Sequence, residues 1–151
     1  MIRLFSTAVL GLAATVLSIT PAAAAPPEPV PTEPDFSTDC GFTVQGEHSG
    51  KFKPIEHAGY TAYVSPNQRV TLTNIETGET VSYVITGVVR ITPTDNGETW
   101  RFTGHNAWGG PGIERILFMT GTQTFVVDEE GTFTLTESHG KVVNVCDVLA
   151  P

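Results

Sequence analysis

Residues 80–91, TVSYVITGVVRI, decide the fold class of this chain. Apolar side chains alternate here with polar ones, and an alternation with a period of two is typical of a strand that buries one face. The apolar positions are Val81, Tyr83, Ile85, Val89 and Ile91. We therefore expect residues 80–91 to form a long strand at the centre of an all-β domain.

Shorter alternations of the same kind lie on both sides of this stretch, and turn sequences separate them. The turns are SPNQ at 65–68, TG at 77–78, DNG at 95–97, EEG at 129–131 and HG at 139–140. Asn96-Gly97 is the strongest hairpin signal, because both residues tolerate a positive φ. We count eight or nine strands joined by short connections, which predicts an antiparallel meander.

A flat meander of this size would have two exposed edge strands. Closure into a barrel, or folding into a two-sheet sandwich, removes or covers these edges. The long candidate strand at 99–108 suits a tilted barrel strand. Gly87 and Gly104 fall on the inward side, where a missing side chain permits sharp coiling of the sheet. The inward apolar candidates are Phe42, Val44, Val70, Leu72, Val81, Tyr83, Ile85, Val89, Trp100, Phe102, Phe125, Val127, Phe133 and Leu135.

Three regions follow one another along the chain. Residues 1–24, with Arg3 before an apolar run and an alanine tract, predict a cleaved secretory signal. An uncleaved membrane anchor is the alternative, because residues 4–25 are long enough to cross a bilayer, although hydroxyl side chains dilute the run and no cationic stop follows. Residues 25–39, APPEPVPTEPDFSTD, are expected to be an extended Pro/Glu-rich tether. Residues 40–151 form the predicted β-barrel-like domain.

Charge and cysteine content agree with export. The chain has 8 basic and 16 acidic side chains, and it becomes more acidic once Arg3 is removed. This balance argues against binding to nucleic acid or to an anionic membrane, since both attract clustered Lys and Arg. We expect a secreted, extracellular or envelope-associated protein whose two cysteines, Cys40 and Cys146, form a disulfide. That bond would pin the last strand against the first.

Several short motifs resemble those of small exported actinobacterial β-domain proteins of unknown function, which have one cysteine near each end of the domain. The resemblance covers most of residues 40–150 and implies export and a single β-domain, but no catalytic residue. The motifs are CGFTV at 40–44, TLTN at 71–74, GHN at 104–106, GPG at 110–112, TG at 120–121 and VCD at 145–147.

Residues 104–112, GHNAWGGPG, carry the strongest candidate site. The alternation directs Asn106 and Trp108 inward and His105 outward, beside a glycine-rich loop. This favours the mouth of a ligand site for a small apolar molecule or an envelope component. In the alternative interpretation the glycines serve turn geometry and Trp108 plugs the end of the barrel.

Two other function classes stay open at this point. A cofactor-free hydrolase or isomerase would use His105, Asn106 and a carboxylate such as Glu137. No histidine spacing fits a metal motif, no nucleophile motif is placed correctly, and we expect neither a cofactor nor a metal. A protein-interaction module would use residues 113–120, IERILFMT, which are apolar on both sides of the predicted strand.

Overall fold

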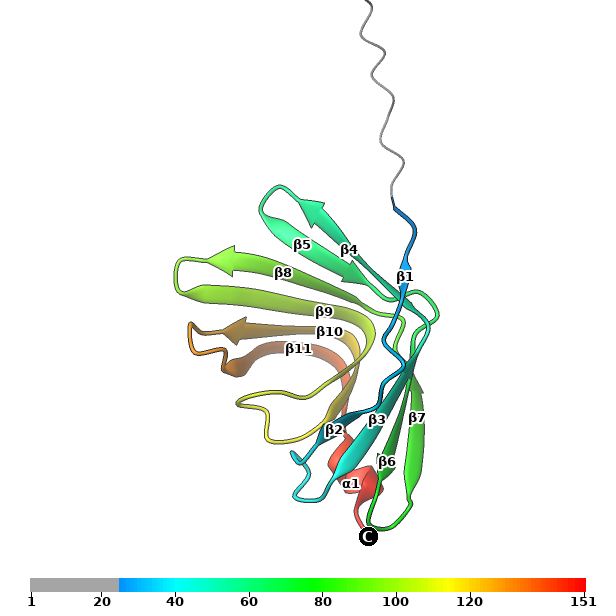
Figure 1. Cartoon of the computed structure of the whole chain (residues 1–151). Coiled ribbons are helices and arrows are strands. Elements are labelled where there is room, and N and C mark those ends of the chain that lie inside the picture. The colour runs from blue at the N-terminus through cyan, green and yellow to red at the C-terminus, as the bar shows by residue number, and fades with distance from the viewer. Residues whose placement is uncertain (1–24) are drawn as a thin grey trace, which may run out of the picture.

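The computed structural model describes residues 25–151, which are almost entirely β-structure (Figure 1). The predicted signal at residues 1–24 lies outside the described residues. Within residues 25–151, no helix is long and apolar enough to cross a membrane. The single helix in this part of the chain, α1, covers Val145–Leu149.

Eleven strands form two antiparallel sheets in this part of the chain. The small sheet has the order β2-β3-β6-β7, with β2 (Asp35–Ser37), β3 (Val44–Ser49), β6 (Arg69–Asn74) and β7 (Thr80–Val84). The large sheet has the order β1-β4-β5-β8-β9-β10-β11, with β1 (Glu28–Pro29), β4 (Lys51–His57), β5 (Tyr60–Val64), β8 (Val88–Thr94), β9 (Gly97–Trp108), β10 (Leu117–Val127) and β11 (Phe133–Asn144). All-β class is thus confirmed, but the sheets are open and do not close into one barrel.

The chain passes between the sheets at short segments, and one of them interrupts the stretch at 80–91. Residues 85–87 separate β7 from β8, so the expected single strand consists of two strands in different sheets. The crossing segments hydrogen-bond to one another, as in Ser65 N to Gly87 O at 3.3 Å and Ile85 N to Gln68 O at 2.9 Å. β5 pairs with β8 in the large sheet and β6 pairs with β7 in the small sheet, so the β5–β6 and β7–β8 connections cross between the sheets side by side.

Glycines mark the line along which the long strands bend. Gly104, Gly121 and Gly140 are paired in register across β9, β10 and β11, and all three have positive φ. A Cβ placed on Gly104 would lie 3.3 Å from the Cα of Gly87, so the row continues to the crossing between β7 and β8. Absent side chains allow this sharp curvature, which is visible in Figure 1.

The C-terminal part of the chain differs from the expectation. His139-Gly140 is not a hairpin turn, because Gly140 is the bend within the continuous strand β11. The expected last strand ends at Asn144, whose side chain accepts a hydrogen bond from Cys146 N and caps α1. Leu135, expected inward, is 45% exposed because β11 is an edge strand of the large sheet.

The core consists of two apolar clusters. One lies between the small sheet, α1 and Ile116, and the other lines the large sheet beneath the β9–β10 connection. Phe118 packs against the first cluster, whereas Leu117 and Met119 belong to the second. Residues 113–120 are therefore apolar on both sides because the structure covers both faces of this segment.

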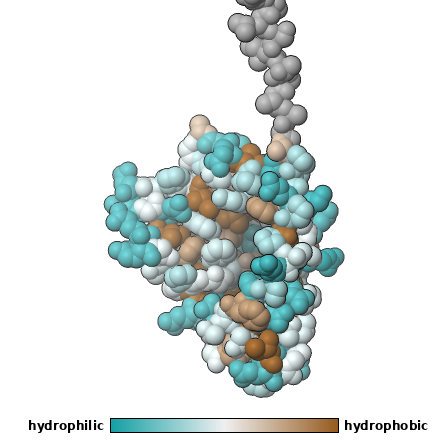
Figure 2. Space-filling view, viewed as in Figure 1, coloured by the Kyte–Doolittle hydropathy of each residue, from teal (hydrophilic) through white to brown (hydrophobic). Residues whose placement is uncertain are grey.

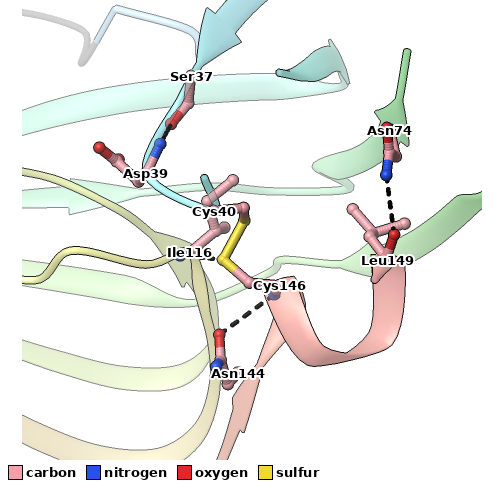
Figure 3. Close-up of a disulfide and its surroundings, with 8 residues drawn as sticks. All are labelled: Ser37, Asp39, Cys40, Asn74, Ile116, Asn144, Cys146 and Leu149. Carbon is pink, nitrogen blue, oxygen red and sulfur yellow. Dashed lines mark hydrogen bonds between the residues drawn. A yellow bond between two sulfur atoms is a disulfide. The ribbon is translucent and has the colours of Figure 1, made fainter. Parts of the chain in front are cut away.

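The predicted disulfide between Cys40 and Cys146 is present, with the two Cα atoms 5.1 Å apart (Figure 3). Cys40 lies between β2 and β3 of the small sheet, and Cys146 lies in α1 after the last strand of the large sheet. The bond therefore joins two sheets, and not the first and last strands of one sheet as expected. Beside it, Asn74 Nδ2 donates to the Leu149 carbonyl at 3.0 Å and holds the end of α1 on the small sheet.

The Pro/Glu-rich segment at 25–39 runs along the domain and contributes strands to both sheets. β1 pairs with β4, and β2 pairs with β3. Between them Val30 is only 7% exposed, and its N–H donates to the Gly50 carbonyl at 3.1 Å. This segment therefore forms one side of the folded body instead of standing apart from it.

Removal of the disulfide tests how the sheets are held together. The bond closes a loop with a sequence separation of 106. In the paired variant Cys40→Ser, Cys146→Ser, we expect the free energy of unfolding to fall by about 3 to 5 kcal/mol because the unfolded chain regains loop entropy. Chemical denaturation of the variant and of the oxidised wild type measures this, and equal denaturation midpoints would contradict it.

Substitution of a bend glycine tests the role of the glycine row. A Cβ on Gly121 would collide with the backbone of His139, whereas a Cβ on Gly131, which also has positive φ, meets nothing within 4 Å. Both alanine variants lose the conformational freedom of glycine, but only Gly121→Ala also overlaps a neighbouring strand. We expect Gly121→Ala to be less stable than Gly131→Ala by about 1 to 3 kcal/mol in denaturation experiments. Equal stability of the two variants would show that the bend tolerates a side chain.

Candidate functional site

A cleft of about 360 Å³ lies between the two sheets. β2, β3 and β6 of the small sheet line one side of it, and β8 and β9 of the large sheet line the other. This volume falls in the range of small-molecule sites. Figure 2 shows apolar side chains in the hollow at the centre of this face. The apolar lining residues are Val44, Val70, Leu72, Ile85, Val89, Phe102, Ala107 and Ile116.

The cleft lies where β9 runs on beyond the end of its pairing with β8, at the side of the large sheet that faces the small sheet. β8 pairs with β9 as far as Thr103, whereas β7, the preceding strand in the small sheet, has no paired strand on its outer side. Gly104 lies at the point of separation, and the residues after it, Asn106 to Gly109, line the cleft. The bend that shapes the sheet thus also positions the candidate segment predicted from the sequence.

Asn106 is a buried polar residue in the wall of the cleft, and the alternation correctly predicts that its side chain points inward. Its side chain is 7% exposed, and Nδ2 donates to the Thr103 carbonyl at 3.2 Å, across the bend at Gly104. A Cβ on Gly87 would overlap the Asn106 amide, so the missing side chain there provides its space. Within residues 25–151 the Asn106 Oδ1 atom accepts no hydrogen bond from a protein donor. It is therefore an acceptor left for a ligand.

Trp108 forms a wall shared by the cleft and the core. Its ring packs against Trp100, Phe102 and Phe133, with ring centroids 5.3, 5.8 and 5.4 Å away. The ring also lines the cleft, and its Nε1 atom is buried with no hydrogen-bond partner among the described residues. Trp108 therefore fits both interpretations, because its ring packs in the aromatic core and also lines the cleft.

His105 and Glu137 lie away from the cleft. Both are exposed, and neither is part of its lining. Glu137 accepts hydrogen bonds from His139 at 3.0 Å and from Thr124 at 3.2 Å, and these bonds, that of His139 first, lower the pKa of the Glu137 carboxyl. Glu137 aligns with Arg101 across β10, four residues before His105, or about 13 Å along the strand. The trio of His105, Asn106 and Glu137 does not converge.

The mouth of the cleft carries an acid–imidazole pair that the sequence did not indicate. His48 Nε2 lies 3.5 Å from Asp35 Oδ1, and both residues line the cleft. Asp35 pairs with Gly46 across β2 and β3, and a side chain on Gly46 would collide with the Asp35 carboxylate. From the sequence, His48 had an acidic neighbour in Glu47, but its partner comes from the segment expected to be a tether.

The geometry at His48 does not form a nucleophile pair. Ser37 and Ser65 also line the cleft. Ser37 Oγ instead accepts the N–H of Asp39, and neither serine hydroxyl forms a hydrogen bond with His48. In the described part of the chain, no group of three His, Cys, Asp or Glu side chains is arranged to hold a metal ion. The side chains lining the cleft offer apolar surface and hydrogen-bond acceptors.

Comparisons with protein-family models, with curated proteins and with solved structures found no match for this chain. The resemblance to small exported actinobacterial domains therefore stays a prediction, and function must be argued from the cleft.

The structural role of Asn106 is testable by its replacement with leucine. Asn106→Leu keeps the approximate size of the side chain but removes the donor to the Thr103 carbonyl. We expect a loss of about 1 to 3 kcal/mol in the free energy of unfolding, because the part-buried Thr103 carbonyl loses its partner. His105→Leu, on the exposed neighbour, is the control and should change stability by less than about 0.5 kcal/mol. An Asn106→Leu variant as stable as its control would refute this structural role.

Proposed function

We propose that this protein is a non-catalytic exported module that binds a small, mainly apolar ligand in the cleft between its two sheets. The observation that carries the proposal is the combination of an apolar cleft of about 360 Å³ with a buried, half-satisfied amide at Asn106. Ligand sites in proteins have this composition, a mostly apolar lining with a few polar groups that fix orientation.

The contacts available to such a ligand follow from the lining. Val44 of β3, Leu72 of β6 and Ile116 of the β9–β10 connection supply apolar surface, so the ligand would be enclosed between layers. The face of Trp108 offers a broad contact, and Asn106 Oδ1 offers a hydrogen-bond acceptor. A small molecule or an amphiphilic envelope component would bury its apolar part here at a gain of about 25 cal/mol per Å².

Export is part of the same proposal. The Cys40–Cys146 disulfide indicates an oxidising, non-cytoplasmic environment. The acidic balance of the chain supports a role away from nucleic acids and anionic membranes. The two other function classes have less support, because the suggested catalytic side chains do not meet and residues 113–120 are covered on both faces.

The cleft is tested with N-phenylnaphthylamine, a neutral apolar fluorophore. We expect the full protein to bind it with a rise in fluorescence, and Ala107→Leu to weaken binding about tenfold by filling the cleft. Ala58→Leu, in the exposed β4–β5 turn, adds the same side chain outside the cleft and should bind like the wild type.

Val89→Phe fills the cleft from β8, the neighbouring strand in the same wall, and serves as a second variant if Ala107→Leu has a lowered melting temperature. The proposal fails if the wild type does not bind the fluorophore, or if both cleft-filling variants bind it as well as Ala58→Leu does.

A further inference from the structure

A second hollow of about 430 Å³ adjoins the cleft. It lies under residues 30–33 of the N-terminal segment, and Phe52 and Tyr63 contribute aromatic surface to it. The two hollows share four lining residues and therefore lie side by side at the boundary between the sheets. We refer to the two hollows together as the trough. The shared residues are Asp35, His48, Ser65 and Gln68.

The charges of this trough have one sign. Three carboxylates line it: Asp39 in the cleft, Glu33 in the second hollow and Asp35 in both. Among residues 25–151, no Lys or Arg lines either hollow, and the one basic side chain in the lining, His48, already faces Asp35 at 3.5 Å. The nearby cations Lys51, Lys53 and Arg69 lie on adjoining strands without lining either hollow. In the part of the chain that the structure describes, the lining contains no basic side chain besides His48, so a ligand meets net negative charge from Asp39 in the cleft and from Glu33 in the second hollow.

The buried polar group of the cleft has the same preference. Asn106 is more than nine-tenths buried, one Nδ2 hydrogen is donated to the Thr103 carbonyl, and Oδ1 can accept a hydrogen bond from a ligand. Trp108 lies in the same wall, and indole rings attract cations. The Trp108 Nε1 is a donor without a partner among the described residues, but the carboxylates, the Asn106 oxygen and the aromatic ring together favour a positively charged hydrogen-bond donor.

We infer that the ligand of this trough is a cationic amphiphile, with an apolar body in the cleft and a protonated amine beside the carboxylate of Asp35 or Asp39. This inference rests on the proposed function and specifies the ligand class for the same site. An anionic amphiphile such as a fatty acid meets repulsion from the carboxylates and finds no free cation in the lining. A neutral alcohol keeps the apolar contacts but lacks the charge attraction.

Three probes with the same eight-carbon chain separate these classes: octylammonium, octanol and octanoate. Titration calorimetry of the full protein at neutral pH and low salt measures each affinity. We expect octylammonium to bind about tenfold more tightly than octanol, and octanoate to bind more weakly than either. The preference for octylammonium should shrink as salt is added, because the carboxylates at the mouth are partly exposed.

Single charge-removing variants test the residues. Asp39→Asn and Asp35→Asn should each weaken octylammonium binding about threefold to tenfold and leave octanol binding unchanged. Asp95→Asn, at the distant β8–β9 turn, is the matched control and should change neither affinity. Asparagine keeps the shape of aspartate, and a folding defect would weaken the binding of octanol as well as of octylammonium. Melting temperatures verify that each variant is folded.

The outcomes distinguish the cationic ligand class from the proposed ligand-binding function on which it rests. Equal binding of octanol and octylammonium, or tighter binding of octanoate, overturns the cationic class and leaves the apolar cleft in place. Unchanged octylammonium affinity in both Asp39→Asn and Asp35→Asn also overturns it. Absence of binding by all three probes, together with no binding of N-phenylnaphthylamine, overturns the proposed function itself.

Discussion

Close backbone approach along the row of Gly87, Gly104, Gly121 and Gly140 is the constraint on which the structure depends. A sheet of long strands hides its apolar face only if it curves, and curvature crowds side chains on the inner side of the bend. Glycine removes that crowding, as the collision of a Cβ on Gly121 or Gly140 with a neighbouring backbone shows. With the bend in place, Ala107 of β9 and Phe118 of β10 pack against the cluster at the small sheet, and α1, which follows β11, completes it.

Covalent and polar contacts hold the bent arrangement where the sheets do not pair with each other. The Cys40–Cys146 bond ties the start of the small sheet to α1, and Asn74 binds the other end of that helix. Val145 and Leu149 of α1 then fill the apolar cluster next to the small sheet. A five-residue helix is not stable by itself, so its place depends on these tertiary contacts.

The cleft is a consequence of incomplete closure. Where β7 and β9 diverge, the inner faces of the two sheets are not in full contact, and the space between them is lined by apolar residues from both. The same divergence leaves the Asn106 acceptor without a protein donor. The incompletely packed part of the fold is therefore also the candidate ligand site. The N-terminal segment contributes the carboxylates of Asp35 and Asp39 to the lining of this cleft.

The sequence by itself determined the all-β class, the inward side of most strands, the paired cysteines and the inward placement of Asn106 and Trp108. These depend on local alternation and on there being only two thiols, which a single chain displays directly. Only the tertiary structure decided the break at residues 85–87, because a period of two continues unchanged when a strand crosses from one sheet to another. Likewise, only long-range pairing placed Asp35 against His48 and separated Glu137 from Asn106, since which strands meet is a property of the folded sheet and not of any local segment.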